Sequence, residues 1–180
     1  RGADLAVIAI LLVACGAIYN LLAIAGALAF RRRRPVPDYQ PPISILKPVR
    51  GRDAGFYEAI RSHATQDYPE FELLFGVSDQ TDPAVAEIGR LQREFPGLTI
   101  RIIRTSNNAP NGKVGSLEIL AAEARHEVLL VNDGDIVVPP GYLADVTGLL
   151  EDANVGLVTG LYRAKGQSFA ARAEALGSVT

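Results

Sequence analysis

The apolar positions divide the chain into a long N-terminal apolar run and a region of short, alternating segments. From Leu5 to Phe30 almost every residue is apolar, and Asn20 is the only strongly polar exception. A helix rises about 1.5 Å per residue, so this run is long enough to span a bilayer core of about 30 Å. It is too long for the apolar region of a signal peptide, and a buried helix of a soluble protein usually keeps a polar face. We therefore expect a single transmembrane helix in residues 1–30.

Beyond residue 42, short apolar runs alternate with segments in which apolar residues recur every three or four positions. Val85, Ile88 and Leu91, for example, share one face of an expected helix. The expected strands are Ile43–Leu46, Phe71–Val77, Leu98–Ile103, Glu127–Val131 and Val155–Tyr162. The expected helices are Ala54–Gln66, Pro83–Phe95, Lys113–Arg125 and Pro140–Glu151. Strands and helices that alternate with short connections predict an α/β fold, in which helices cover a mainly parallel sheet.

A basic and proline-rich linker, residues 31–42, separates the two regions. Arg31–Arg34 directly follow the apolar run, and arginines beside a spanning helix tend to stay in the cytoplasm and attract anionic lipids. Five of the 18 Lys and Arg residues precede residue 35, but only one of the 20 Asp and Glu residues does, so the remainder has a net charge of −6. This excess of acid argues against a nucleic-acid surface. We expect a cytoplasmic domain over residues 43–180, anchored to the membrane.

Polar segments follow the first four expected strands, and they supply the candidate chemistry. They read "KPVRG", "SDQTD", "SNNAPNGK" and "NDGD", and in a parallel sheet they share the rim at which ligands bind. Asp133 and Asp135 repel each other unless a cation lies beside them, and a hard divalent cation such as Mg²⁺ fits oxygen ligands. Substrate phosphates usually complete its shell, and Lys113 adds a charge for the same phosphates. The pattern indicates a site for a nucleotide-diphosphate donor, with an ordinary solvated turn as the alternative.

The sequence excludes several other kinds of site. The segment "NAPNGKV" is not a Walker loop, because the first glycine is absent and Val114 replaces the Ser or Thr. No G-x-G-x-x-G follows a strand, and no G-x-S-x-G nucleophile elbow is present. The single cysteine excludes a disulfide framework and a cysteine-rich zinc site. His63 and His126 are far apart in sequence, and we interpret both as surface or helix-end residues.

Four ordered blocks carry a family resemblance: "ISILKPVRG", "QDYPEFELLFGVSDQTDPA", "GKVGSLEILAAEARHEVLLVNDGDIVVPPGYL" and "VGLVTGLYR". The stretch from Ile43 to about Tyr162 resembles the nucleotide-binding half of family-2-type inverting glycosyltransferases with the GT-A fold. More narrowly, it is similar to the ceramide glucosyltransferase group and to bacterial relatives that glycosylate hopanoid lipids. The resemblance implies a membrane-anchored enzyme that moves glucose or N-acetylglucosamine from a UDP-sugar to the hydroxyl of a lipid such as ceramide or a hopanoid. It also implies Mg²⁺ or Mn²⁺ as the cofactor.

The resemblance implies roles for individual residues. Asp79 matches the family's first aspartate, which contacts the nucleotide. Asp133 matches the second, and with Asp135 it forms a D-x-D site for metal and diphosphate. Lys113 matches a lysine of the donor site. Lys47 and Pro48 match the segment near the base of the nucleotide. The chain departs from its relatives in "NDGDI" and at Ser116 and Glu118, where relatives often have asparagine, and these departures leave the sugar open.

Three alternative functions stay open at this point. One is a glycosyltransferase of the polysaccharide-synthase type, which is also anchored in a membrane. Another is a phosphatase of the haloacid dehalogenase type, because Asp133, Asp135 and Val137 meet its D-x-D-x-[TV] motif; that motif, however, normally follows the first strand. The third is a non-catalytic membrane scaffold.

The catalytic base of an inverting transferase is not evident among residues 1–180. In the resembling family it is an aspartate well downstream of D-x-D. None of the acidic residues after Asp135 lies in a recognisable acceptor motif. We therefore expect the base beyond Thr180, and we expect residues 1–180 to bind the donor without transferring sugar.

Overall fold

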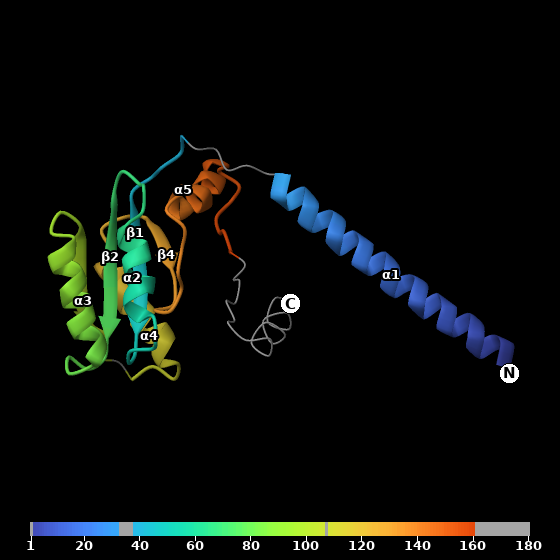
Figure 1. Ribbon diagram of the computed structural model, residues 1–180, viewed down its shortest axis with the longest axis horizontal. Coiled ribbons are helices and arrows are strands. Elements are labelled where there is room, and N and C mark those ends of the chain that lie inside the picture. The colour runs from blue at the N-terminus through green and yellow to red at the C-terminus, as the bar shows by residue number, and fades with distance from the viewer. Residues whose placement is uncertain (1, 33–37, 107, 161–180) are drawn as a thin grey trace. The chain divides into compact units, whose positions relative to one another are not determined.

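The computed structural model describes residues 2–32, 38–106 and 108–160 (Figure 1), and the chain divides into two compact units at residue 35. The first unit is the helix α1 (Gly2–Arg32). Its segment Ala6–Gly26 has a mean hydropathy of 2.6 and is long and apolar enough to cross a membrane. None of this segment is buried within the protein, and apolar side chains such as Leu12 and Leu22 are exposed. The helix is thus a candidate membrane span by length and composition, and it is not a buried core helix.

The second unit is built on a parallel sheet of four strands among the residues described. They are β1 (Ile43–Val49), β2 (Phe71–Val77), β3 (Thr99–Arg104) and β4 (Val128–Val131). Their order is β3-β2-β1-β4, and Ile43 at the start of β1 is aligned with Phe71 on one side and Val128 on the other. The chain therefore moves outward from β1 to β3 and returns with β4 to the other side of β1. A topological switch point lies between β1 and β4, and in open parallel sheets ligands bind beyond the carboxyl ends of the strands at such a point.

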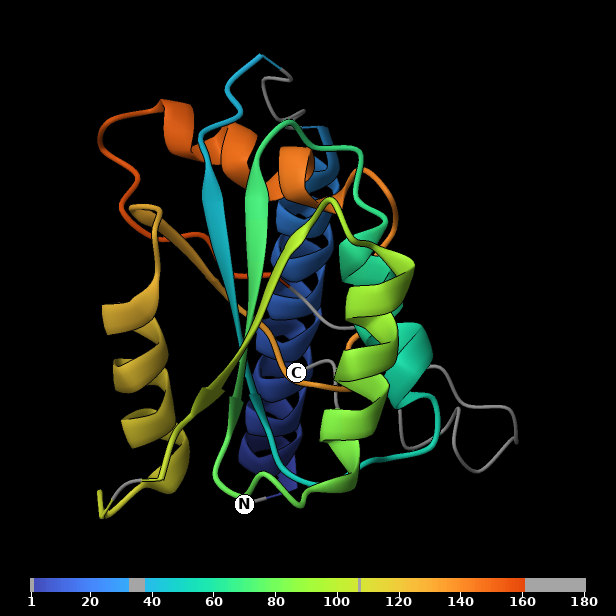
Figure 2. The same ribbon diagram turned by 90° about the vertical axis from the view of Figure 1, so that its left-hand side faces the viewer.

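Helices cover both faces of this sheet, as Figure 2 shows. The helices α2 (Phe56–Ala64) and α3 (Pro83–Glu94) lie on one face, and α4 (Gly112–Glu123) lies on the other. A short helix, α5 (Tyr142–Thr147), follows β4 and continues into a 3₁₀ turn at Gly148–Glu151. With helices on both faces, the two central strands β1 and β2 are buried on both sides, which explains why both are rich in apolar residues.

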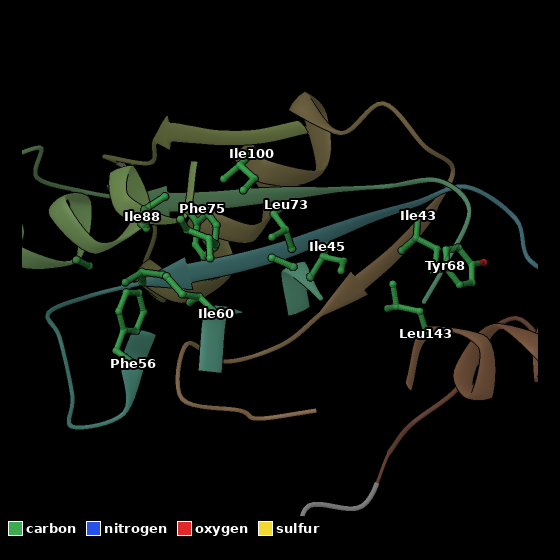
Figure 3. Close-up of a cluster of buried hydrophobic side chains, with 14 residues drawn as sticks. Ile43, Ile45, Phe56, Ile60, Tyr68, Leu73, Phe75, Ile88, Ile100 and Leu143 are labelled. Carbon is green, nitrogen blue, oxygen red and sulfur yellow. The ribbon is translucent and has the colours of Figure 1, made fainter. Parts of the chain in front are cut away.

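The main core lies between the sheet and the helices α2, α3 and α5 (Figure 3). Its fully buried apolar residues are Ile43, Ile45, Ile60, Leu73, Phe75, Ala84, Ile88, Leu91 and Leu143. A smaller cluster of Leu46, Leu74 and Leu120 lies between the sheet and α4. The two clusters fix the sheet between its helices, so the carboxyl ends of the strands form a firmly supported rim.

Side-chain caps begin two of the helices next to that rim. Asp82 precedes Pro83, and its Oδ1 accepts a hydrogen bond from the Ala84 N–H at 2.9 Å. Asn111 begins α4 in the same way, because its Oδ1 accepts from the backbone N–H groups of Lys113 and Val114 at 3.1 and 3.3 Å. Both caps satisfy N–H groups that have no partner inside the helix. The Asn111 cap also fixes the direction in which α4 leaves the rim, and with it the position of Lys113.

The structure confirms the α/β fold and the order of its first eight elements, and the ends of the first seven lie within three residues of the predicted ones. The largest strand difference is in β1, which continues to Val49 because Lys47 and Pro48 still pair with β2. The expected helix Pro140–Glu151 is shorter than predicted: α5 ends at Thr147, and Gly148 begins the 3₁₀ turn.

The expected strand Val155–Tyr162 is wrong for its described part, since residues 155–160 are irregular. A turn directs the chain away before the segment begins, because the Val155 N–H donates to the Asp152 carbonyl at 2.8 Å. Leu157 is 80% exposed, so the segment buries little apolar surface as it passes. The last two residues of the expected strand, and residues 33–37 of the linker, lie outside the described residues.

Candidate functional site

A pocket of about 680 Å³ lies at the carboxyl ends of the strands. Segments that follow all four strands contribute to its wall, as the polar segments of the sequence predicted. Its lining residues are Pro48, Val49, Arg50, Gly51, Asp53, Phe56, Gly76, Ser78, Thr105, Ser106, Gly112, Lys113, Ser116, Asp133, Gly134 and Asp135. Since β1 and β4 both end here, the pocket occupies the switch point of the sheet.

The turn from Asp133 to Asp135 follows β4, and both of its carboxylate residues line this pocket. The Asp133 side chain is half-exposed, and its Oδ1 accepts a hydrogen bond from the Lys113 Nζ at 2.5 Å. Asp135 is exposed. A Cβ atom at Gly134 would lie 3.3 Å from Cε2 of Phe56, a distance that is tighter than ordinary van der Waals contact. The residue between the carboxylates therefore lies against an aromatic ring, which explains why the position suits glycine.

The donor set at this turn suits a hard divalent cation that is shared with a ligand. Asp133 and Asp135 offer carboxylate oxygens, which are the ligands that Mg²⁺ prefers. Among residues 2–32, 38–106 and 108–160, no three His, Cys, Asp or Glu side chains converge to form a complete metal site. The position of the Lys113 ammonium shows that positive charge is already favoured beside Asp133. The residues thus fit a cation whose remaining ligands come from a bound phosphate group.

Lys47 lies behind the turn and is not part of the pocket lining. Its side chain is fully buried, and its Nζ donates a hydrogen bond to the backbone carbonyl of Asp133 at 2.9 Å. Burial lowers the pKa of the Lys47 amine to about 7, against the opposing effect of the Asp133 and Asp135 carboxylates. Pro48, the next residue, lines the pocket, because successive residues of a strand point to opposite faces.

Asp79 lies on the same rim, after β2, but outside the pocket lining. It is exposed, and its Oδ1 accepts a hydrogen bond from the Thr81 N–H at 2.8 Å. This hydrogen bond holds the pKa of the Asp79 carboxyl below its usual value. Of the residues expected in the site, the structure therefore brings Pro48, Lys113, Asp133 and Asp135 together, places Lys47 behind them and places Asp79 to the side.

Several pocket residues had no role in the sequence prediction. Arg50, Asp53 and Ser78 line the pocket. Arg50 and Ser78 belong to segments that were expected on the rim, and Asp53 does not. Asp82 also acts here, since its Oδ2 accepts a hydrogen bond from the Gly51 N–H at 2.7 Å and so ties the first loop to α3. Gly51 has a φ of 75°, a conformation that favours glycine. The glycine and the nearby helix cap were the available sequence signals for this contact.

His63 lies in the last turn of α2, as the helix-end interpretation allows, but it is fully buried and is not a surface residue. It lies on the inner face of α2 in phase with Phe56 and Ile60, and this periodicity was the signal that placed it inside. Burial, together with the nearby Lys47 ammonium, lowers the pKa of His63 to about 3. The imidazole is therefore neutral at physiological pH. His126, by contrast, is only half-buried and lies two residues before β4.

Comparison with known proteins places the chain among glycosyltransferases. The model of glycosyl transferase family 21 matches residues 7–180. A ceramide glucosyltransferase of Komagataella phaffii is 28% identical over 133 residues, which cover 71% of this chain and 26% of the relative. A beta-monoglucosyldiacylglycerol synthase of Nostoc sp. is 26% identical over 120 residues, which cover 66% of this chain and 25% of the relative. The chain thus spans about a quarter of the length of these curated relatives.

Two solved structures with the same fold contain bound nucleotide sugars. A mannosyltransferase from Pyrobaculum calidifontis in complex with GDP-Man and Mn²⁺ matches with a TM-score of 0.63 and 24% identity, over 76% of this chain and 41% of that one. Residues 1–349 of TarS from S. aureus, in complex with UDP-GlcNAc, match with a TM-score of 0.51 and 17% identity, over 69% of this chain and 38% of that one. At these identities the likeness shows the GT-A fold alone.

Proposed function

The chain belongs to glycosyl transferase family 21, and from this premise we propose that it is the donor-binding part of a membrane-anchored glycosyltransferase. The enzyme transfers glucose or N-acetylglucosamine from a UDP-sugar to the hydroxyl of a lipid such as ceramide or a hopanoid. One observation carries the proposal: Lys113, Asp133 and Asp135 converge on one pocket at the switch point of a parallel sheet. Family membership also favours a transferase over the phosphatase and the scaffold.

The names of the relatives support the lipid acceptor and the sugar nucleotide. Ceramide glucosyltransferases and a beta-monoglucosyldiacylglycerol synthase are among the similar proteins. The structures with the same fold contain GDP-Man with Mn²⁺, or UDP-GlcNAc. An apolar helix that can cross a bilayer would keep the site close to lipid headgroups, which favours a lipid over a soluble acceptor.

Each residue of the site has a defined task in this proposal. Asp133 and Asp135 would hold Mg²⁺ or Mn²⁺, whose remaining ligands would come from the donor. When bound, the cation supplies the charge that stabilises the departing diphosphate. Lys113 leaves Asp133 and donates to the same phosphates, which it reaches as a flexible point charge. Pro48 and Asp79 contact the nucleotide end of the donor, at the ends of β1 and β2.

The catalytic base is the part of the mechanism that the described residues do not supply. An inverting transfer needs a base beside the acceptor hydroxyl. The described pocket lining contains three carboxylates, those of Asp53, Asp133 and Asp135. A bound cation would engage the lone pairs of the last two, and Asp53 lies in the loop after β1, at the proposed nucleotide end of the donor. We propose that the base lies outside residues 1–180, so that this chain binds UDP-sugar without transferring the sugar.

Transfer is tested by incubating the chain in liposomes with UDP-glucose or UDP-N-acetylglucosamine, Mn²⁺, and ceramide or a hopanoid polyol. We expect no glycolipid. Glycolipid formation that is lost in Asp53→Asn would contradict this expectation and identify Asp53 as the base.

Donor binding is tested by thermal unfolding of the chain in detergent. UDP with Mn²⁺, at about 100 times the dissociation constant, should stabilise the folded state by about 2.7 kcal/mol. NAD is the control, because no dinucleotide fingerprint is present in the sequence. A shift with NAD and none with UDP and Mn²⁺ would overturn the proposed function.

The orientation in the membrane is proposed from Arg31–Arg34, which follow the apolar helix and favour a cytoplasmic domain. A reporter fused after Thr180 should be active in the cytoplasm. Activity only on the opposite side of the membrane would contradict this orientation.

A further inference from the structure

The turn that presents the two carboxylates receives little support from the sheet itself. Pairing of β4 with β1 ends at Val131, and Asn132 adds one more backbone hydrogen bond, from its N–H to the Leu46 carbonyl at 3.3 Å. The chain then leaves the sheet at Asp133. Contacts from other elements must therefore fix the direction of the Asp133 and Asp135 carboxylates.

One such contact comes from Lys47 of β1. Its ammonium lies beneath the turn, and its Nζ donates to the Asp133 carbonyl at 2.9 Å. The side chain is fully buried, and a buried ammonium is tolerated only where it finds strong acceptors. Lys47 thus holds the backbone of the very residue whose carboxylate faces the pocket.

A second contact comes from His63 of α2 through Asn132. His63 Nδ1 lies 3.0 Å from the Ala59 carbonyl, and a carbonyl only accepts hydrogen bonds, so Nδ1 must carry the proton. His63 Nε2 is therefore the acceptor, and it receives a hydrogen bond from Asn132 Nδ2 at 3.0 Å. Asn132 is 3% exposed. The tautomer of the histidine and the orientation of the amide are fixed together, directly before Asp133.

We propose that Lys47 and His63 are positioning residues that hold the Asp133–Asp135 turn from behind, so that its carboxylates bind a divalent cation and the diphosphate of the donor. Lys47 holds the turn at the Asp133 carbonyl, and His63 holds it at the Asn132 side chain. They come from β1 and α2, so the first strand and helix of the domain set the geometry of a site formed after the fourth strand. This inference rests on the proposed function.

The expected size of the effect follows from partners of metal ligands in other proteins. Removing a group that orients a metal ligand typically weakens metal affinity by about 10–100-fold. The loss arises because the turn samples other conformations, although every ligand atom is still present.

Two substitutions of His63 separate this role from general packing. His63→Gln keeps an acceptor near the position of Nε2, so it should preserve the hydrogen bond from Asn132. His63→Asn keeps only a donor near the position of Nδ1, and it is too short to reach Asn132. Both variants are polar and smaller than histidine, so packing losses affect both.

Lys47→Met and Ser44→Ala form a second pair on β1. Lys47→Met removes the ammonium and keeps a long apolar side chain. Ser44 is also fully buried, but its hydroxyl bonds to Glu72 at 2.7 Å, at the opposite end of the strand. Ser44→Ala therefore disturbs the same strand without touching the turn.

The test measures Mn²⁺ binding in the presence of UDP by electron paramagnetic resonance, on the full chain in detergent. Hydrogen exchange of the peptide that covers the turn is measured on the same samples. We expect His63→Asn and Lys47→Met to weaken Mn²⁺ affinity at least about tenfold and to speed exchange at the turn. His63→Gln and Ser44→Ala should stay within about twofold of the wild type, well below the loss of an orienting partner.

A failure of the proposed function and a failure of the positioning role give different results. A wild-type chain that binds neither Mn²⁺ nor UDP contradicts the proposed function itself. A wild-type chain that binds both, with His63→Asn and Lys47→Met unchanged in affinity and exchange, overturns the positioning role alone. Equal losses in His63→Asn and His63→Gln would also overturn it, because packing and not the acceptor would then be responsible.

Discussion

At the scale of single residues, the glycine between the two carboxylates has a steric reason. A Cβ atom at Gly134 would meet the Phe56 ring at 3.3 Å, and Phe56 is itself buried in the core. The ring can move little, so the turn would have to move. The pattern Asp-Gly-Asp is thus more than a flexible turn, since the glycine lets the turn lie close against α2.

Gly134→Ala should destabilise the fold by about 1–3 kcal/mol, as overpacked positions generally do, and should weaken binding of UDP with Mn²⁺. Urea denaturation and calorimetry measure the two effects. Gly141→Ala is the matched control, because a Cβ atom there meets nothing within 4 Å. Equal stability of the two variants would show that the contact with Phe56 imposes no constraint.

The buried histidine predicts a dependence of stability on pH. The folded-state pKa of His63 is lowered to about 3, below its unfolded value of about 6.5. The unfolded state therefore binds the proton first, so this contribution to stability is complete above pH 6.5 and declines as the pH falls from 6.5 toward 3. The free energy of unfolding should drop by about 1.4 kcal/mol per pH unit from this group in that window.

The measurement is urea denaturation between pH 7.5 and 5 for the wild type and for His63→Gln. We expect a shallower decline for the variant, because glutamine does not titrate. Parallel curves would mean that His63 is accessible to protons in the folded protein.

Several residues of the site could be grouped from the sequence alone. The sequence grouped Pro48, Lys113, Asp133 and Asp135 on one rim because all of them follow strands. It did not show that Lys47 points away from the pocket, since the strand continues through it and side chains alternate. The role of Asp82 toward Gly51 also depends on tertiary contact, and the sequence signalled only its two halves, a glycine after β1 and a helix cap before α3.

At the scale of elements, the periodicity of apolar residues predicted most of the helices and strands, and it failed for one segment that is incompletely buried. Strand β2 was expected with its observed ends, because its apolar run is buried on both faces. The segment Val155–Gly160 has the composition of a strand, but it turns away at Asp152 and stays largely exposed. Composition alone does not say whether a neighbouring strand is present to pair with it.

The difference in burial between β2 and β4 predicts that a leucine-to-alanine substitution lowers the free energy of unfolding by different amounts in the two strands. Leu73 of β2 is fully buried in the core, whereas Leu129 of β4 is 43% exposed. Leu73→Ala should cost about 2–5 kcal/mol, and Leu129→Ala about 1 kcal/mol or less. Chemical denaturation of both variants provides the test. A large loss for Leu129→Ala would mean that the outer side of β4 is covered in solution.

At the scale of the whole molecule, the two units have different roles in the proposed function. The helix α1 has the length and apolarity to anchor the protein, and the sheet unit carries the pocket. Strands β2 and β3 are added on one side of β1, and β4 is added on the other side, parallel to β1. The carboxyl ends of β1 and β4 therefore lie side by side. This topology brings Lys113 and Asp133, which are 20 residues apart, into contact, and it places the Asp133–Asp135 turn at the switch point.

The central claim is that the Asp133–Asp135 turn binds the metal and the diphosphate together, and calorimetric titration with UDP tests it most directly. The dissociation constant is measured with Mn²⁺ and with EDTA for the wild type, Asp135→Asn and Asp145→Asn. Asp145 is an exposed carboxylate on α5, outside the pocket lining. We predict that Mn²⁺ strengthens UDP binding at least about tenfold, or about 1.4 kcal/mol, in the wild type and in Asp145→Asn. In Asp135→Asn this gain should disappear, and an equal gain in that variant would contradict the account.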